Sequence, residues 1–169
     1  SIGTHFVFDW LSQSAEPIFN LVALSYAGNL HNLDALRGNA RHVFVQGDIG
    51  ARALVALLLA EHRPRAIVNF AAESHVDRSI HGPGEFMHTN VLGTFALLEA
   101  ARGYWGGMEG DAKASFRFLH VSTDEVYGSL APGAPAFTES HPHEPNSPYS
   151  ASKAASDHLV RAWHHTYGL

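Results

Sequence analysis

Two carboxyl groups stand side by side in residues 122–128 (STDEVYG), the part of this sequence best suited to acid and base chemistry. Asp124 and Glu125 can divide these roles if their surroundings push their pKa values apart. Thr123, directly before them, offers a hydroxyl that can hold an oxygen atom of a substrate. The acidic pair also has a simpler interpretation, in which it caps a helix or faces solvent.

A tyrosine and a lysine four residues apart form the second reactive group. Tyr149 and Lys153 fall at the start of a predicted helix, where this spacing places two side chains on one face. An ammonium group beside a phenol favours the phenolate and lowers the pKa of the phenol, so Tyr149 could take a proton from a substrate hydroxyl. The pattern is weak alone, because such pairs are common on helix surfaces. The acidic pair and the surrounding strands and helices strengthen it.

These side chains must be positioned by a chain in which strands and helices alternate. Apolar periodicity predicts strands at residues 18–24, 42–46, 66–71 and 116–121, and helices at residues 4–14, 51–62, 84–102 and 148–166. We expect a glycine-rich loop at 103–114 and a long loop at 122–147, whose length is usually functional in a compact domain. The alternation predicts an α/β fold, a doubly wound parallel sheet of the Rossmann-like type. The STDEVYG run follows the strand at 116–121 at its carboxyl end, where such sheets bind ligands.

The start of the chain departs from this arrangement. A dinucleotide-binding domain opens with a strand, a glycine-rich turn and a helix, and here only the helix is evident, with Gly3 as the last glycine of the turn. The first strand lies in the centre of such a sheet, so its absence predicts a gap between the strands at 18–24 and 66–71. We therefore expect residues 1–169 to form one dinucleotide-binding domain that lacks its first strand and a C-terminal substrate domain. The alternative is a natural domain that pairs those two strands directly.

The composition of the 169 residues fits one globular domain and excludes several classes of protein. Apolar residues make up 46%, charged residues 16%, and the formal charge of −5 comes with no basic stripe, so we expect no nucleic-acid partner. Cysteine is absent, which excludes disulfides and thiolate chemistry. No run is apolar enough to span a membrane and the start has no basic export signal, so we expect a cytoplasmic protein. The histidines at 141–143 and 164–165 lack carboxylates at ligand spacing, and we expect no metal site.

Six segments, in order along the chain, carry a resemblance to a known family. They are residues 26–29 (YAGN), 47–49 (GDI), 71–80 (AAESHVDRSI), 89–90 (TN), 123–128 (TDEVYG) and 147–153 (SPYSASK). With them the chain resembles the dTDP-glucose 4,6-dehydratases, NAD-dependent enzymes of the extended short-chain dehydrogenase/reductase family. The AESHVDRSI and TDEVYG segments discriminate, because related epimerases carry other residues in place of the Asp-Glu pair. The YxxxK pattern is shared by the whole superfamily.

The resemblance implies a reaction that converts dTDP-glucose to dTDP-4-keto-6-deoxyglucose and water. Tyr149 would take the proton of the C4 hydroxyl while hydride passes to bound NAD, and Lys153 would tune Tyr149 and touch the nicotinamide ribose. The resulting ketone acidifies the C5 hydrogen, which Glu125 would remove while Asp124 protonates the departing C6 hydroxyl. The hydride would then return to C6. Thr123 would hold the C4 oxygen.

Further binding residues are implied by the same resemblance. Asn90 matches a helix asparagine that supports the site. The implied cofactor contacts are Gly3, Asp48, Ile49, Ala71, Ala72, Ser74, Tyr149 and Lys153, with Asp48 and Ile49 on the adenine side, and the implied substrate contacts are Ser74, Thr123, Asp124 and Glu125. Two interpretations stay open for His75, Asp77 and Arg78, which either bind ligand or form a polar helix entry packed under the sheet.

The resemblance also implies a homodimer. In the family, the long helices equivalent to residues 84–102 and 148–166 pair across a twofold axis into a four-helix bundle. An apolar stripe follows the second of these helices at helical spacing and comprises Ala154, Ala155, Leu159, Ala162 and Trp163. Burial of the stripe against the protein's own sheet explains much of it equally well.

One position departs from the family pattern, and it bears on the alternatives. Val22 stands where the family has an acidic residue that binds the adenosine ribose, so the ribose is bound differently or NAD is held more weakly. A sugar-nucleotide epimerase or decarboxylase is one alternative, since it would share Tyr149 and Lys153 without needing both carboxyls. A non-catalytic remnant is another, supported by Val22 and the absent strand. The intact set of five reactive residues opposes it and favours a fragment of an active parent.

Overall fold

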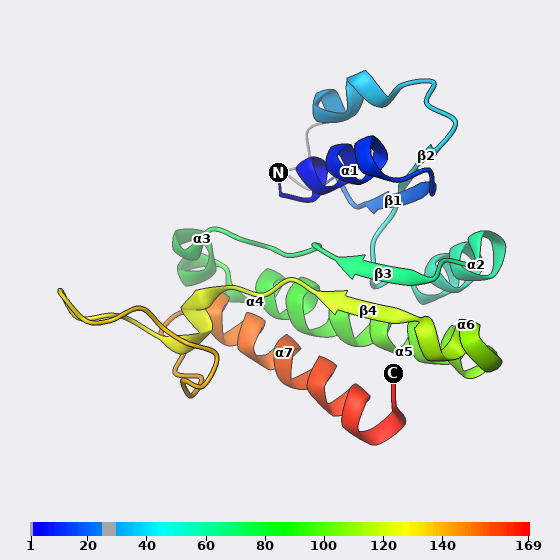
Figure 1. Ribbon diagram of the computed structural model, residues 1–169. Coiled ribbons are helices and arrows are strands. Elements are labelled where there is room, and N and C mark those ends of the chain that lie inside the picture. Colours follow the sequence, from blue (N-terminus) through cyan, green and yellow to red (C-terminus); the bar gives the residue numbers. More distant parts are fainter. Residues whose placement is uncertain (1, 25–29) are drawn as a thin grey trace.

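The computed structural model describes residues 2–24 and 30–169, so the YAGN segment and Ser1 lie outside the described residues. Helices and strands alternate along the chain, as predicted (Figure 1). The strands are β1 (Ile18–Val22), β2 (His42–Gln46), β3 (Ala66–Asn69) and β4 (Arg117–His120). The α-helices are α1 (Ile2–Gln13), α2 (Arg52–His62), α3 (Val76–His81), α4 (Pro83–Phe86), α5 (Thr94–Gly106), α6 (Gly110–Ser115) and α7 (Pro148–Tyr167). Three further helical segments are η1 (Leu30–Leu36), η2 (Met87–Gly93) and η3 (Asp124–Tyr127).

The strands form two separate parallel sheets. β1 pairs with β2, and β3 pairs with β4, each pair in parallel. Among the described residues no ladder joins β1 to β3. The predicted gap between these two strands is therefore confirmed, and the alternative in which they pair directly is wrong. Since both sheets are parallel, the carboxyl ends of β3 and β4 meet at one edge.

Side-chain contacts, mostly apolar, hold the two sheets together in place of a backbone ladder. One cluster joins helices α2 and α5 through Val55, Leu59 and Leu97, and Leu21 of β1 and Ile67 of β3 pack against it. Helices α4, α5 and α7 lie along one side of the β3–β4 sheet (Figure 1). A second cluster of buried residues lies between α1 and η1. The core therefore fixes the strand ends from which the site is built.

The helix predicted at 84–102 contains an irregular segment. The backbone is helical from α4 to α5, but η2 is a π-helix, whose turns are wider than those of an α-helix. Such segments occur frequently at functional sites. One residue of η2, Asn90, faces the interior and is 1% exposed. The widened turn lies in the part of the helix that contacts α7.

The glycine-rich loop predicted at 103–114 is wrong. Helix α5 continues to Gly106, and α6 fills most of the remainder. The aromatic side chains of the segment explain this, since Tyr104 donates a hydrogen bond to the Pro64 carbonyl and Trp105 donates one to the Lys113 carbonyl. Tyr104 also packs edge-on against Phe116. These contacts outweigh the low helix propensity of glycine, which costs about 1 kcal/mol per residue.

Helix α7 begins and ends where the sequence predicts. Ser147 accepts a hydrogen bond from the backbone of Ser150, and the Ser150 hydroxyl accepts one from the backbone of Ser147, which forms a capping box. Pro148 occupies the first turn, where its missing N–H is not needed. Gly168 ends the helix in the left-handed conformation. The caps fix the first turn of α7, which carries Tyr149.

Candidate active site

The acidic pair is held in a tight turn directly after β4. The Thr123 hydroxyl accepts a hydrogen bond from the backbone N–H of Glu125 and thereby caps η3. Gly128 ends the turn at a φ of 102°, and a Cβ atom there would lie 2.8 Å from the Glu144 carbonyl oxygen. The turn therefore requires glycine. Asp124 is exposed and Glu125 partly buried, so the two carboxyls have different surroundings, as divided acid and base roles require.

Tyr149 meets this turn from the first turn of α7. Burial raises the pKa of the Tyr149 phenol, the negative charges of Glu125 and Asp124 raise it further, and a hydrogen bond with the Thr123 hydroxyl opposes them. Phe86 packs edge-on against the Tyr149 ring at a centroid distance of 6.2 Å. Four of the five residues predicted to carry the chemistry are thus brought together, although they come from two parts of the chain.

Lys153 lies on the same face of α7 as Tyr149, but its ammonium group is hydrogen-bonded to the backbone after β4. Its Nζ donates a hydrogen bond to the carbonyl oxygen of Val121, 2.6 Å away, and the residue is 4% exposed. Burial lowers the pKa of Lys153, and the Asp157 carboxylate opposes this. The prediction that the ammonium lowers the pKa of Tyr149 is wrong for this arrangement, because the phenol pKa is raised and Lys153 does not contribute to it. Helical spacing determines the face of α7 on which Lys153 lies, whereas the Val121 carbonyl oxygen after β4 determines where the Lys153 ammonium lies.

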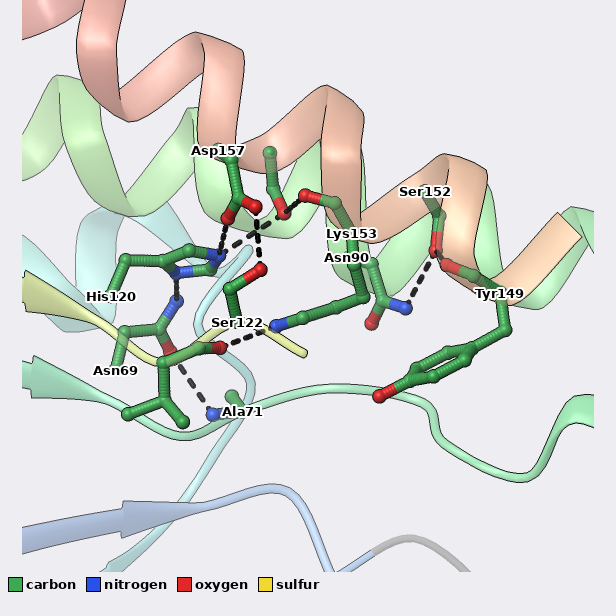
Figure 2. A network of polar contacts seen from close by, with 11 residues as sticks. Asn69, Ala71, Asn90, His120, Ser122, Tyr149, Ser152, Lys153 and Asp157 are labelled. Atoms are coloured by element: carbon green, nitrogen blue, oxygen red, sulfur yellow. Dashed lines mark hydrogen bonds and ion pairs between the residues drawn. The ribbon is translucent and has the colours of Figure 1, made fainter. Parts of the chain in front are cut away.

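Asn90 links the loop after β3 to helix α7. Its Oδ1 accepts a hydrogen bond from the Glu73 N–H at 2.8 Å, and its Nδ2 donates to the Glu73 carbonyl at 2.9 Å. The same Nδ2 donates to the Ser152 hydroxyl, which in turn donates to the Tyr149 carbonyl (Figure 2). Asn90 therefore lies where a supporting residue is needed, and that role stays a prediction.

The residues predicted on the adenine side follow β2. The Asp48 side chain is exposed, and its Oδ1 accepts a hydrogen bond from the Gly50 N–H at 2.6 Å. The Ile49 side chain is buried in the core and packs against Gly93, so packing alone accounts for it. Gly3 lies in the first turn of α1, where a Cβ atom would be 3.5 Å from the Phe70 ring, an ordinary contact that does not require glycine. Cofactor contacts by these three residues remain predictions.

The segment after β3 contains the other predicted binding residues. The Ala71 N–H donates a hydrogen bond to Asn69 Oδ1, which fixes the start of the segment, and Ala72 and Ser74 are half-buried beyond it. His75 has a φ of 82°, a strained conformation that non-glycine residues rarely adopt. Strain of this kind clusters at functional sites, which favours a functional role for the loop.

Arg78 and Asp77 lie in the helix entry that follows. The guanidinium of Arg78 lies 3.7 Å from a Glu73 carboxylate oxygen and 3.6 Å from one of Glu85. These ion pairs support the structural interpretation of Arg78, a polar helix entry packed near the sheet. Asp77 is exposed in the first turn of α3. A carboxylate at that position interacts favourably with the helix N-terminus.

Sequence reasoning missed a buried polar network beside the site. Asn69 and His120 are cross-strand partners at the ends of β3 and β4, and their side chains are hydrogen-bonded (Figure 2). His120 also contacts Ser156 and Asp157 of α7, and the Ser122 hydroxyl donates to Asp157. The signal in the sequence is a polar residue that ends each of two apolar strands.

The histidine-rich segments have local partners. His141 Nδ1 accepts a hydrogen bond from the Thr138 N–H at 3.0 Å, and His164 Nδ1 lies 3.1 Å from the Leu169 carbonyl oxygen. Within residues 2–24 and 30–169, no group of three or more histidine and carboxylate side chains could hold a metal ion. In the same residues, no helix has both the length and the apolar character that a bilayer crossing needs.

Solved structures of known proteins share this fold. A dTDP-glucose 4,6-dehydratase from Streptomyces venezuelae, solved with NAD bound, superposes with a TM-score of 0.88 at 47% identity and is matched over 99% of this chain and 50% of its own. The UDP-glucose 4-epimerase of Thermus thermophilus, in complex with NAD, has a TM-score of 0.84 at 30% identity over 100% of this chain and 49% of its own. Dehydratases and epimerases therefore both have this architecture, a Rossmann-like α/β fold, so the fold alone does not separate them.

Sequence comparison separates dehydratases from epimerases better than the fold does. The dTDP-glucose 4,6-dehydratase of Xanthomonas campestris pv. campestris (strain B100) is 63% identical over 168 residues, which are 99% of this chain and 47% of that enzyme. The dTDP-glucose 4,6-dehydratase of Neisseria meningitidis serogroup B is 52% identical over the same length. The chain spans about half the length of the curated relatives it matches. The model of one family, described as GDP-mannose 4,6 dehydratase, matches residues 1–169, and the chain belongs to that family.

Proposed function

We propose that the protein containing this chain is a dTDP-glucose 4,6-dehydratase that uses NAD. The observation that carries the proposal is the meeting of Tyr149 with Thr123, Asp124 and Glu125 at the carboxyl edge of the β3–β4 sheet. Both carboxyls are needed to remove water from a sugar, whereas a simple oxidation needs neither. Relatives with this name, 63% and 52% identical to the chain, support the choice of substrate.

The residues present fit a dinucleotide at this edge. Ala71 and Ala72 have small side chains that let a flat ligand approach the backbone after β3, and the Asn69 side chain holds that backbone in place. Lys153 is buried nearby and supplies a positive charge. NAD, when bound, would accept the C4 hydrogen as hydride and later return it to C6. The end of β1 fits less well, because Val22 offers no carboxylate to the ribose hydroxyls.

Each protein group then has one task. The Tyr149 phenolate takes the proton of the C4 hydroxyl, and Thr123 holds the same oxygen. Glu125 takes the C5 proton, which the C4 ketone has acidified. Asp124 gives its proton to the C6 hydroxyl, so that the C6–O bond breaks and water leaves. An Asp124 that carries this proton has no negative charge, which removes one of the influences that raise the pKa of Tyr149.

The test is turnover by the natural protein in full length. It is given dTDP-glucose and NAD, and the 4-keto-6-deoxy product is followed by its absorbance in alkali. We expect this product and no net reduction of NAD. A folded protein that binds NAD but forms no product would contradict the proposal and favour another sugar nucleotide or a non-catalytic role.

We further propose a homodimer in the cytoplasm, formed through α5 and α7, with no nucleic-acid or membrane partner. The support is an apolar patch that runs from η2 and α5 onto the end of α7, defined by Leu92, Phe95, Trp163 and Tyr167. Leu92 is 56% exposed and Tyr167 is 43% exposed. Exposed apolar residues gathered on one helix pair are typical of a surface that another chain covers. Residues 1–169 would then be the NAD-binding domain.

A further inference from the structure

Three consecutive residues at the end of β4 are each bonded to helix α7. The contacts join His120 to Ser156, the Val121 carbonyl to Lys153, and the Ser122 hydroxyl to Asp157. Lys153 is thereby held at both ends, because its Nζ is fixed by Val121 and its carbonyl accepts a hydrogen bond from Ser156. Figure 2 shows these contacts lying between the strand ends and the helix that carries Tyr149. None of the residues that hold Lys153 is assigned a role in the proposed reaction.

The direction of the hydrogen bonds fixes the tautomer of His120. Asn69 Oδ1 accepts from the Ala71 N–H at 3.1 Å, so its Nδ2, which can only donate, faces His120 Nδ1 at 3.2 Å. Nδ1 must then be the acceptor, and the ring proton is on Nε2. That proton is donated to the Ser156 hydroxyl at 3.1 Å, and Ser156 donates its own proton to the Lys153 carbonyl at 2.8 Å. One directed chain therefore runs from Ala71 to Lys153.

His120 stays neutral in this network. Its side chain is 4% exposed, and burial together with the nearby charge of Lys153 lowers its pKa to about 4. The Asp157 carboxylate, 3.7 Å from Nε2, does not offset these effects. A second ring proton would also point Nδ1–H at the amide hydrogens of Asn69. His120 is thus unsuited to exchanging protons during turnover, and its fixed geometry is what it can contribute.

We propose that His120 is a positioning residue that sets the backbone beside the cofactor, at Ala71, in register with Lys153 on α7. The inference rests on the proposed function, because it takes the loop after β3 and Lys153 as the two sides of an NAD site. Without His120, α7 loses one of its three links to the end of β4, the one that reaches the Lys153 carbonyl through Ser156, and Lys153 is held less firmly beside the cofactor. His120 itself touches neither ligand.

The test uses three substitutions that remove the contacts selectively. His120→Leu removes both side-chain hydrogen bonds of His120, the one with Asn69 and the one with Ser156. His120→Gln keeps an N–H near the Nε2 position, and His120→Asn keeps an acceptor near the Nδ1 position. The matched control is His42→Leu on β2, because burial also lowers the pKa of His42 and this residue lies at the far end of the other sheet. NAD affinity is measured by calorimetry on the natural full-length protein, together with kcat, KM and the pH profile of kcat for dTDP-glucose.

We expect H120L to bind NAD about tenfold more weakly, to lose kcat by about 10- to 100-fold, and to keep its KM for dTDP-glucose. The pH profile of kcat should stay unchanged, because Lys153 does not contribute to the pKa of Tyr149. H120Q should recover most of the loss and H120N less, since only H120Q keeps the link to Ser156. H42L should change none of these values. If H120L does not fold, the comparison of H120Q with H120N decides whether the link to Ser156 sustains NAD affinity and kcat.

Other outcomes separate this inference from the proposed function. Turnover of dTDP-glucose with wild-type NAD affinity and wild-type kcat in every His120 variant would overturn the inference and leave the function intact. If the sugar is not turned over while NAD affinity still depends on His120, the function is wrong and the inference stands. A protein that does not bind NAD overturns both. Nitrogen-15 NMR of the ring gives a check without ligand, and a proton found on Nδ1 of His120 would also overturn the inference.

Discussion

Tyr149 is subject to opposing influences at a single oxygen atom. Burial and two carboxylates raise the pKa of the phenol, and one hydroxyl opposes them. The sequence predicts the participants, because Thr123, Asp124, Glu125 and Tyr149 do meet. It does not predict the balance of charge, since the position of the Lys153 ammonium depends on the Val121 carbonyl, which no spacing rule reveals. A base at this position therefore depends on how bound ligands change its surroundings.

Glu125→Gln should separate oxidation from elimination. The glutamine cannot take the C5 proton, so formation of the 4-keto-6-deoxy product should fall about 100-fold or more while C4 oxidation continues. Reduced nicotinamide should then accumulate, which its absorbance measures. Glu144→Gln, an exposed carboxyl of the following loop, is the control and should behave as wild type. An epimerase would tolerate E125Q with nearly full turnover.

Val22→Asp should strengthen NAD binding. A carboxylate at the end of β1 can accept hydrogen bonds from the ribose, and a bond to a charged group contributes about 1.5–3 kcal/mol, which is about tenfold or more in affinity. The affinity for NADP should not increase, because the new negative charge repels its 2′-phosphate. Titration calorimetry with both dinucleotides measures the difference. Equal affinities for NAD before and after the substitution would place the ribose away from β1.

At the scale of elements, most of the fold follows from periodicity. All four strands and the principal helices lie where apolar alternation and caps predict them, because each element buries one face. Besides helix α6, which replaces most of a predicted loop, two further features escaped prediction for a physical reason. The π-helix η2 depends on how Asn90 is drawn toward Glu73 and Ser152, and the Asn69–His120 pair depends on the register of two strands far apart in sequence.

Asn90→Ala should destabilise the protein more than Ser152→Ala. The first leaves the buried N–H and carbonyl of Glu73 without partners, which we expect to cost about 2–4 kcal/mol, whereas the second removes the hydroxyl at one end of the link and should cost about 1 kcal/mol. Urea unfolding measures the free energies of both variants. Equal losses would mean that the link to α7, rather than the Glu73 backbone, is what Asn90 maintains.

His120 should make stability depend on pH. Its pKa is about 4 in the fold and near 6.5 when the chain is unfolded, so between these values the unfolded state binds more protons. Stability from this group is complete above about pH 6.5 and is lost as the pH falls toward 4, by up to about 3 kcal/mol. Asp157, whose pKa is raised by burial, acts in the opposite direction. Urea unfolding of wild type and H120Q over this range should show the steeper loss in wild type.

For the whole molecule, the arrangement of surfaces bears on assembly. Leu92→Glu should weaken the proposed dimer, because a charge would enter an apolar patch that the partner covers. Sedimentation velocity should detect a larger monomer fraction. Leu57→Glu is the matched control, since Leu57 is 61% exposed on α2, away from the patch. If neither substitution changes the monomer fraction, this patch is excluded as the interface.

The division into two sheets has a dynamic consequence. Because no ladder joins β1 to β3 among the described residues, the ladder of one sheet can open without breaking a hydrogen bond of the other. Within residues 2–24 and 30–169, the coupling between the two sheets then depends on side chains, among them Leu21 and Ile67 in one core cluster and the Arg65–Glu16 ion pair. Local opening of the β1–β2 sheet would leave in place the link from Asn90 through Ser152 to Tyr149 and the contacts of His120 with Asn69 and Ser156. The segment after β2 can therefore fluctuate while the surroundings of Tyr149 stay ordered.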